Sequence, residues 1–124
     1  MTIAYWCVLA AALLPFAFTL IAKVKGEKFN NRRPREWQSQ LTGLPQRAHA
    51  AQLNSFEAFP PFAAAVIIAH QLGAPQVAVD GLALAFVACR ILYGVLYIAD
   101  QPSARSVVWF LGVACVVALF VVAA

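Results

Sequence analysis

The chain has 124 residues, of which 63% are hydrophobic and only 11% are charged. A soluble domain of this size carries roughly 25% charged residues and has too little interior to bury so much apolar surface. Together with a mean hydropathy of +0.77, this excludes an ordinary soluble domain and predicts an integral membrane protein. The net charge of +4 is local, because most of the Lys and Arg residues lie between positions 23 and 35. We interpret this cluster as a loop at the membrane surface rather than a nucleic-acid site.

Four segments are long enough for membrane-spanning helices, which need about 20 residues. The first covers about residues 3–22, and a polar, basic loop follows over 23–45, where Gly, Asn and Pro disfavour a long helix. The second covers about 46–72, and short turns separate it from the third at 77–99 and the fourth at 104–122. The sequence therefore predicts a single all-α domain, a bundle of four transmembrane helices.

The distribution of Lys and Arg predicts how this bundle lies in the membrane. The first connection is strongly basic, so the positive-inside rule places the first and third connections in the cytoplasm and both termini outside. The start of the second helix, the end of the third and the start of the fourth then meet at one face. Polar residues near these ends converge within about 15 Å of depth.

The second segment carries a polar face in an otherwise apolar stretch. Arg47, Asn54 and Glu57 fall within about 80° of one another on a helix. A carboxylate at membrane depth costs several kcal/mol unless it is paired or lines a polar cavity. Asn54 and Glu57 are therefore either a structural pair that ties helices together or part of a ligand site. Arg90 also lies in an apolar run, and we expect it to form a buried ion pair with Glu57.

The third and fourth segments supply the other candidates. Arg90, Tyr93 and Tyr97 share one helical face, where the tyrosines serve either as interface anchors or as ligand contacts. Arg105 lies in or beside the first turn of the fourth helix, where unpaired amides and a positive dipole suit an anion or a thiolate. The alternative is that Arg105 reaches the lipid headgroups. No spacing of Cys or His indicates a metal site.

These residues carry a family resemblance. The stretch RAHAAQLNSFEAFPPF at 47–62, the run from Arg90 to Tyr97, and Arg105 with Ser106 resemble small bacterial members of the MAPEG family, the membrane-associated proteins in eicosanoid and glutathione metabolism. The resemblance covers essentially the whole chain. It implies a homotrimer of four-helix bundles in the bacterial inner membrane, with glutathione held between neighbouring subunits.

The resemblance also implies roles for individual residues. Asn54 and Glu57 match residues that bind the peptide part of glutathione, Tyr93 and Tyr97 match residues that line the same cleft, and Arg105 matches the residue proposed to stabilise the thiolate. There is one departure: Ala50 stands where the eicosanoid-synthesising branch has Arg, which argues against leukotriene or prostaglandin chemistry.

The first hypothesis is a glutathione-dependent transferase or peroxidase that acts on hydrophobic electrophiles or lipids. In this hypothesis Arg47, Asn54, Glu57 and Tyr93 hold the tripeptide, Arg105 activates its thiol, and no metal takes part. One alternative is a small proton-coupled multidrug transporter. It is disfavoured because Glu57 lies in the second span rather than the first and the first loop favours one orientation. A non-catalytic membrane scaffold is the other alternative.

Overall fold

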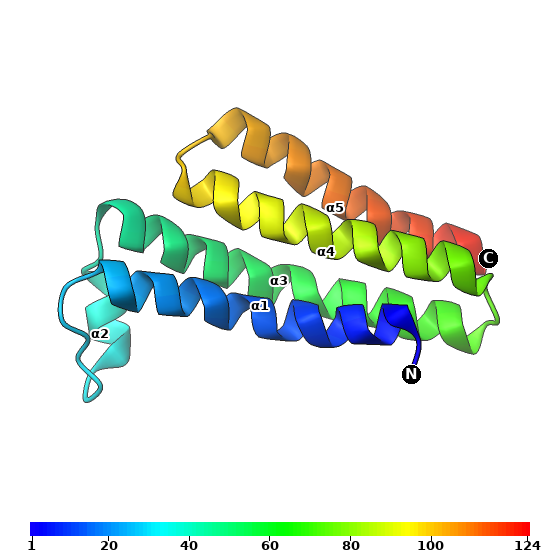
Figure 1. Ribbon diagram of the computed structural model, residues 1–124, viewed down its shortest axis with the longest axis horizontal. Coiled ribbons are helices and arrows are strands. Elements are labelled where there is room, and N and C mark those ends of the chain that lie inside the picture. The colour runs from blue at the N-terminus through cyan, green and yellow to red at the C-terminus, as the bar shows by residue number, and fades with distance from the viewer.

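The structure is a computed structural model that describes residues 1–124, and its regular elements are all helical. Four long helices run side by side in alternating directions, and a short helix lies at one end of them (Figure 1). In chain order the helices are α1 (Ile3–Lys25), α2 (Pro34–Ser39), α3 (Gly43–Gln71), α4 (Gln76–Ile98) and α5 (Pro102–Ala123).

Each predicted helix has a counterpart whose ends lie within a few residues of those expected, but the helix α2 was not predicted. The prolines of the 23–45 loop were expected to break helices. Pro34 instead begins α2, and Pro45 lies in the first turn of α3. At these positions the proline ring removes only an N–H group that has no partner within the helix.

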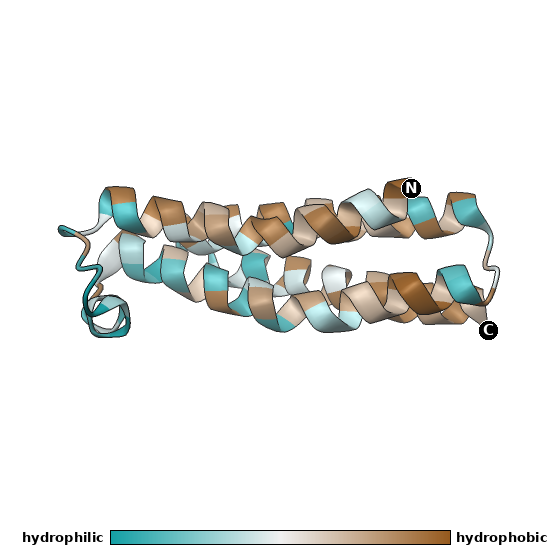
Figure 2. Ribbon diagram, turned by 90° about the horizontal axis from the view of Figure 1, so that it is seen from below, coloured by the Kyte–Doolittle hydropathy of each residue, from teal (hydrophilic) through white to brown (hydrophobic).

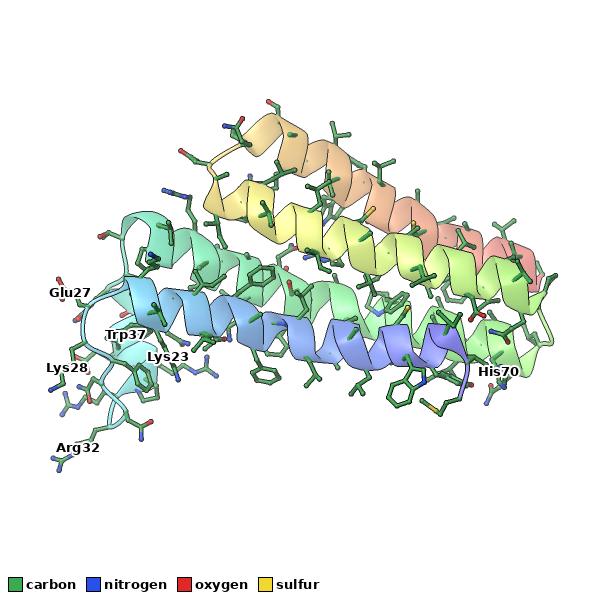
Figure 3. The ribbon with its side chains drawn as sticks, in the orientation of Figure 1. Lys23, Glu27, Lys28, Arg32, Trp37 and His70 are labelled. Atoms are coloured by element: carbon green, nitrogen blue, oxygen red, sulfur yellow. The ribbon has the colours of Figure 1, made fainter.

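The loop and α2 are folded against the end of the bundle through Trp37. This side chain is buried, and its Nε1 donates a hydrogen bond to the Glu27 carbonyl oxygen at 3.2 Å. Its ring meets that of Phe29 edge to face, with centroids 5.0 Å apart. The axis of α2 lies across the long axis of the bundle (Figures 1 and 2), while Lys28 and Arg32 point away from it (Figure 3).

Three helices, α1, α4 and α5, are long and apolar enough to cross a membrane. Four such spans were predicted from the sequence. The helix α3 has 29 residues, so its length suffices, but the polar residues of its first half lower its hydropathy. Only 25 of the 124 residues are buried, which leaves many large apolar side chains on the outside, as a lipid environment requires. Figure 2 shows hydrophilic residues gathered toward the end that carries α2.

The helices approach one another closely because small residues line their contacts, as is usual in membrane bundles. The larger core cluster is rich in alanine and lies in the half of the bundle away from α2. Nearer to α2, a Cβ added at Gly94 of α4 would overlap the ring of Phe18 of α1. At the opposite end, Asp80 accepts a hydrogen bond from the Ala4 amide at 2.8 Å and so caps the start of α1.

Candidate functional site

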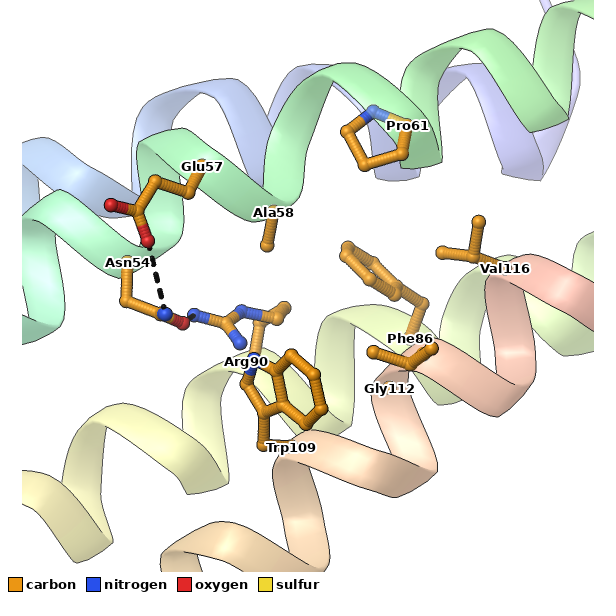
Figure 4. A pocket seen from close by; sticks show the side chains of 10 residues that line it. Asn54, Glu57, Ala58, Pro61, Phe86, Arg90, Trp109, Gly112 and Val116 are labelled. Carbon is orange, nitrogen blue, oxygen red and sulfur yellow. Dashed lines mark hydrogen bonds between the residues drawn. The ribbon is translucent and has the colours of Figure 1, made fainter.

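A pocket of about 220 Å³ lies between α3, α4 and α5. Three of the residues singled out in the sequence, Asn54, Glu57 and Arg90, form its polar side (Figure 4). The remaining lining is apolar and consists of Ala58, Pro61, Phe86, Trp109, Gly112, Val113 and Val116. The pocket therefore joins a polar group of side chains to an apolar chamber within the bundle.

The polar side of the pocket is a hydrogen-bonded relay. Arg90 Nη2 donates to Asn54 Oδ1 at 2.7 Å, and Asn54 Nδ2 donates to Glu57 Oε2 at 3.3 Å (Figure 4). The prediction of an ion pair between Arg90 and Glu57 is wrong. The one salt bridge in the chain joins Arg33, just before α2, to Glu36 within it. The amide of Asn54 both accepts and donates, so it bridges the guanidinium and the carboxylate without their meeting.

Arg90 is the buried member of this relay, with 4% of its surface exposed. Besides Asn54 Oδ1, a second oxygen, Ser55 Oγ, lies 3.5 Å from Arg90 Nη2, at the limit of a hydrogen bond. Its Nε has no hydrogen-bond partner. The guanidinium is thus held in the bundle interior by neutral groups, and one of its donors is unsatisfied.

An aromatic row continues from Arg90 toward the start of α5. The Arg90 guanidinium carbon lies 4.3 Å from the ring centroid of Tyr93, and the rings of Tyr93 and Tyr97 meet edge to face at 5.7 Å. Arg105 stacks on Tyr97, with its guanidinium carbon 4.1 Å from the centroid of the Tyr97 ring. Six of the seven predicted site residues therefore form one chain of contacts, from Glu57 through Asn54 and Arg90 to Arg105.

The seventh residue, Arg47, lies at the same end of the bundle but outside the pocket. Its Nε donates to the carbonyl oxygen of Ile98 at 3.0 Å, which satisfies one of the carbonyl groups left without a partner at the end of α4. Tyr93, Tyr97 and Arg105 also do not line the pocket. The two tyrosines continue from the pocket along α4, and Arg105 lies beyond them in the first turn of α5.

The apolar part of the pocket was not predicted from the sequence. Phe86 lies one turn before Arg90 on the same face of α4 and stacks on Phe62, with centroids 3.9 Å apart. On α5, Trp109, Gly112 and Val116 recur at spacings of three and four residues. This helical periodicity was visible in the sequence, but it is common to every packed helix face and does not distinguish a pocket from a core.

The MAPEG family profile matches residues 3–124, nearly the whole chain. No curated protein and no solved structure matched the chain. This match covers far more than half of the chain, and the chain is an all-helical membrane protein whose polar residues gather as the motifs suggested. The chain therefore belongs to the MAPEG family.

Proposed function

We propose that this protein is a membrane-bound glutathione transferase or peroxidase that activates the glutathione thiol for attack on apolar electrophiles. The family includes glutathione-dependent enzymes as well as members without catalytic activity. The observation that supports the enzymatic alternative is the relay from Arg90 through Asn54 to Glu57, which borders an apolar pocket within the bundle. A purely structural tie between helices needs no such pocket.

The row of polar and aromatic side chains matches the length of a tripeptide. Arg90 and Tyr97 are seven residues apart on α4, a rise of about 10 Å, and three extended residues also span about 10 Å. In the proposed complex the Glu57 carboxylate receives the ammonium group of glutathione. Arg47 uses only its Nε on Ile98, so its terminal nitrogens are available to a glutathione carboxylate.

Arg105 supplies the charge that activates the thiol. A free thiol has a pKa near ~8.5 and attacks as the thiolate, so a positive charge beside it raises the reactive fraction at neutral pH. Arg105 lies in the first turn of α5, where the helix dipole adds to the effect of the guanidinium. The thiolate then attacks an electrophilic centre of a molecule that reaches the site through the bilayer.

The proposed active form is a homotrimer in which α3 crosses the membrane beside the other three helices. Glu57 is exposed on the single chain, and Asn54 is half-buried. An exposed carboxylate at membrane depth is costly, so we infer that a neighbouring subunit covers this face of α3. The basic loop lies in the cytoplasm.

Calorimetry of the detergent-solubilised protein with glutathione tests the proposed function. We expect saturable binding at up to millimolar ligand. Glu57→Gln should weaken it at least about tenfold, because a hydrogen bond between two charged groups is replaced by a weaker one. Glu36→Gln, which removes the same charge in the exposed helix α2, is the matched control and should bind normally. No heat at millimolar glutathione would contradict the proposal.

A further inference from the structure

The basic loop between α1 and α3 carries the whole net charge of the chain. Residues 23–36 contain six Lys and Arg residues and two Glu residues, while the rest of the chain carries three charges of each sign. All six basic side chains are exposed. The loop is therefore a concentrated cationic surface on a chain that is otherwise neutral.

Two of the six cations are already engaged within the loop and α2. Arg33 forms a salt bridge with Glu36 at 3.3 Å, and Arg35 Nη1 donates to Gln38 Oε1 at 3.2 Å. The other four form no salt bridge, and we call them the free cations: Lys23, Lys25, Lys28 and Arg32. Their charges are available to an anion from outside the chain.

The loop is folded, so these cations are held on a platform rather than on a flexible tail. Trp37 is buried beneath the loop, and Phe29 packs edge to face against it. The Lys23 ammonium lies 4.0 Å from the centroid of the Phe29 ring, which leaves the outer side of the ammonium open. A group of cations held in this way loses less conformational entropy when it binds an anion than a disordered segment does.

The position of the loop brings the free cations to the level of the lipid phosphates. A helix crosses the ~30 Å hydrocarbon core in about 20 residues, so α1, which begins at Ile3, reaches the headgroups near Lys23. The loop and α2 then extend to the side of α1, across the long axis of the bundle (Figure 1). Arg32 lies to the side of α1 and not straight beyond its end (Figure 3). The loop therefore lies over the lipids that surround the bundle.

We propose that the free cations bind the phosphate group of an acidic phospholipid in the leaflet next to the basic loop. Four to eight Lys or Arg residues directly after a spanning helix are typical of segments that recognise acidic lipids. The sideways course of the loop favours lipid over a nucleic acid, which would approach from the aqueous side. The bound lipid fastens the loop and α2 to the membrane surface. This site is separate from the pocket between α3, α4 and α5, and it does not rest on the proposed function.

Native mass spectrometry of the full chain in an uncharged detergent tests the proposal, because it resolves each bound lipid. The probes are phosphatidylglycerol and phosphatidylcholine with identical acyl chains, so they differ only in the headgroup and its charge. Each basic side chain near an anionic lipid contributes about fivefold in affinity. We expect phosphatidylglycerol to bind at least about tenfold more tightly than phosphatidylcholine. This preference should shrink as ammonium acetate is raised from about 0.1 M to about 1 M, because salt screens exposed charges.

Two double variants separate the charge from the side chains that carry it. Lys28→Gln with Arg32→Gln removes two free cations and should lower the affinity for phosphatidylglycerol at least about tenfold, with little effect on phosphatidylcholine. Arg33→Gln with Glu36→Gln also changes two exposed residues but leaves the net charge as it was. It is the matched control and should keep the wild-type preference.

Several results would overturn this proposal. Equal affinity of the wild type for the two lipids would remove the acidic-lipid site, and an equal loss in both double variants would show that the free cations are not its cause. Displacement of phosphatidylglycerol by inorganic phosphate, beyond that by chloride at equal ionic strength, would make the loop a site for free phosphate. Tighter binding of a single-stranded oligonucleotide than of phosphatidylglycerol would make it a nucleic-acid surface.

Discussion

At the residue scale, Asn54 is the side chain on which the site depends, because it alone joins Arg90 to Glu57. Asn54→Leu removes the shortest acceptor of a buried guanidinium, and we expect it to lower the free energy of unfolding by about 1–3 kcal/mol. Glu57→Gln keeps a carbonyl oxygen for the Asn54 amide and should be close to wild type in stability. Unfolding in mixed detergents, followed by circular dichroism, measures both. A larger loss for Glu57→Gln would point to a direct effect of the carboxylate charge on Arg90.

Arg105 is predicted to act on the thiol rather than on folding, since its contact is with the half-buried Tyr97. In Arg105→Ala the pKa of the bound glutathione thiol should rise by about one unit, which corresponds to ~1.4 kcal/mol of lost thiolate stabilisation. Arg105→Lys should recover part of this, because the charge remains while the planar guanidinium is lost. Thiolate absorbance in the ultraviolet, recorded as pH is raised, gives the pKa.

The control for Arg105 is Arg32→Ala, which removes an equal charge from the exposed loop and should not change the thiol pKa. If wild type and the Arg105 variants share one thiol pKa, Arg105 anchors the helix at the membrane surface. The activating charge would then come from another residue.

At the scale of elements, the contact between α1 and α4 sets where the tyrosine row lies. Gly94 stands directly after Tyr93 and faces Phe18, so Gly94→Ala places a methyl group within the space of the Phe18 ring. We expect a loss of about 1–3 kcal/mol in unfolding free energy, as for other overpacked sites. Gly81→Ala is the matched control on the same helix, because open space surrounds that position. It should be neutral or slightly stabilising, since Ala is the better helix former.

A substitution at Phe18 tests whether the clash with its ring causes the loss of stability in Gly94→Ala. Phe18→Ala should reduce the cost of Gly94→Ala, although it leaves a cavity of its own. Equal effects of Gly94→Ala in the two backgrounds would show that Phe18 is not the obstacle.

At the scale of the whole molecule, the exposed polar face of α3 predicts self-association. Glu57 is exposed at a depth where the other helices present apolar side chains, and three subunits that share this face would shield it from lipid. Sedimentation in density-matched detergent should give a protein mass three times that of the 13.4 kDa chain. A monomer at micromolar concentration would contradict the proposed assembly.

Orientation is the second prediction at this scale. With the three native cysteines replaced by Ala, Asn31→Cys marks the basic loop and Gln71→Cys marks the opposite end of the bundle. In sealed right-side-out vesicles, a membrane-impermeant maleimide should label Gln71→Cys at once and Asn31→Cys only after permeabilisation. The reverse pattern would place the basic loop, and with it the candidate site, outside the cell.

The sequence by itself determined the membrane class, the four long helices and the end at which the site gathers. Hydropathy and helical periodicity are properties of short stretches, so they predict helices without knowledge of their neighbours. Asn54, Tyr97 and Arg105 could be assigned to one end because each lies near a helix end and successive helices alternate in direction. The motifs around Asn54 and Arg90 then sufficed to suggest the family.

Only the tertiary structure decided which side chains meet. The helix α2 depends on the burial of Trp37 beneath the loop, and Arg47 is held by a carbonyl group 51 residues away. The relay through Asn54 replaced the expected ion pair because helix packing sets the distance between Arg90 and Glu57, and spacing within either helix does not. The pocket likewise needs three helices at once. Such features depend on the relative rotation and separation of helices, which local periodicity leaves undetermined.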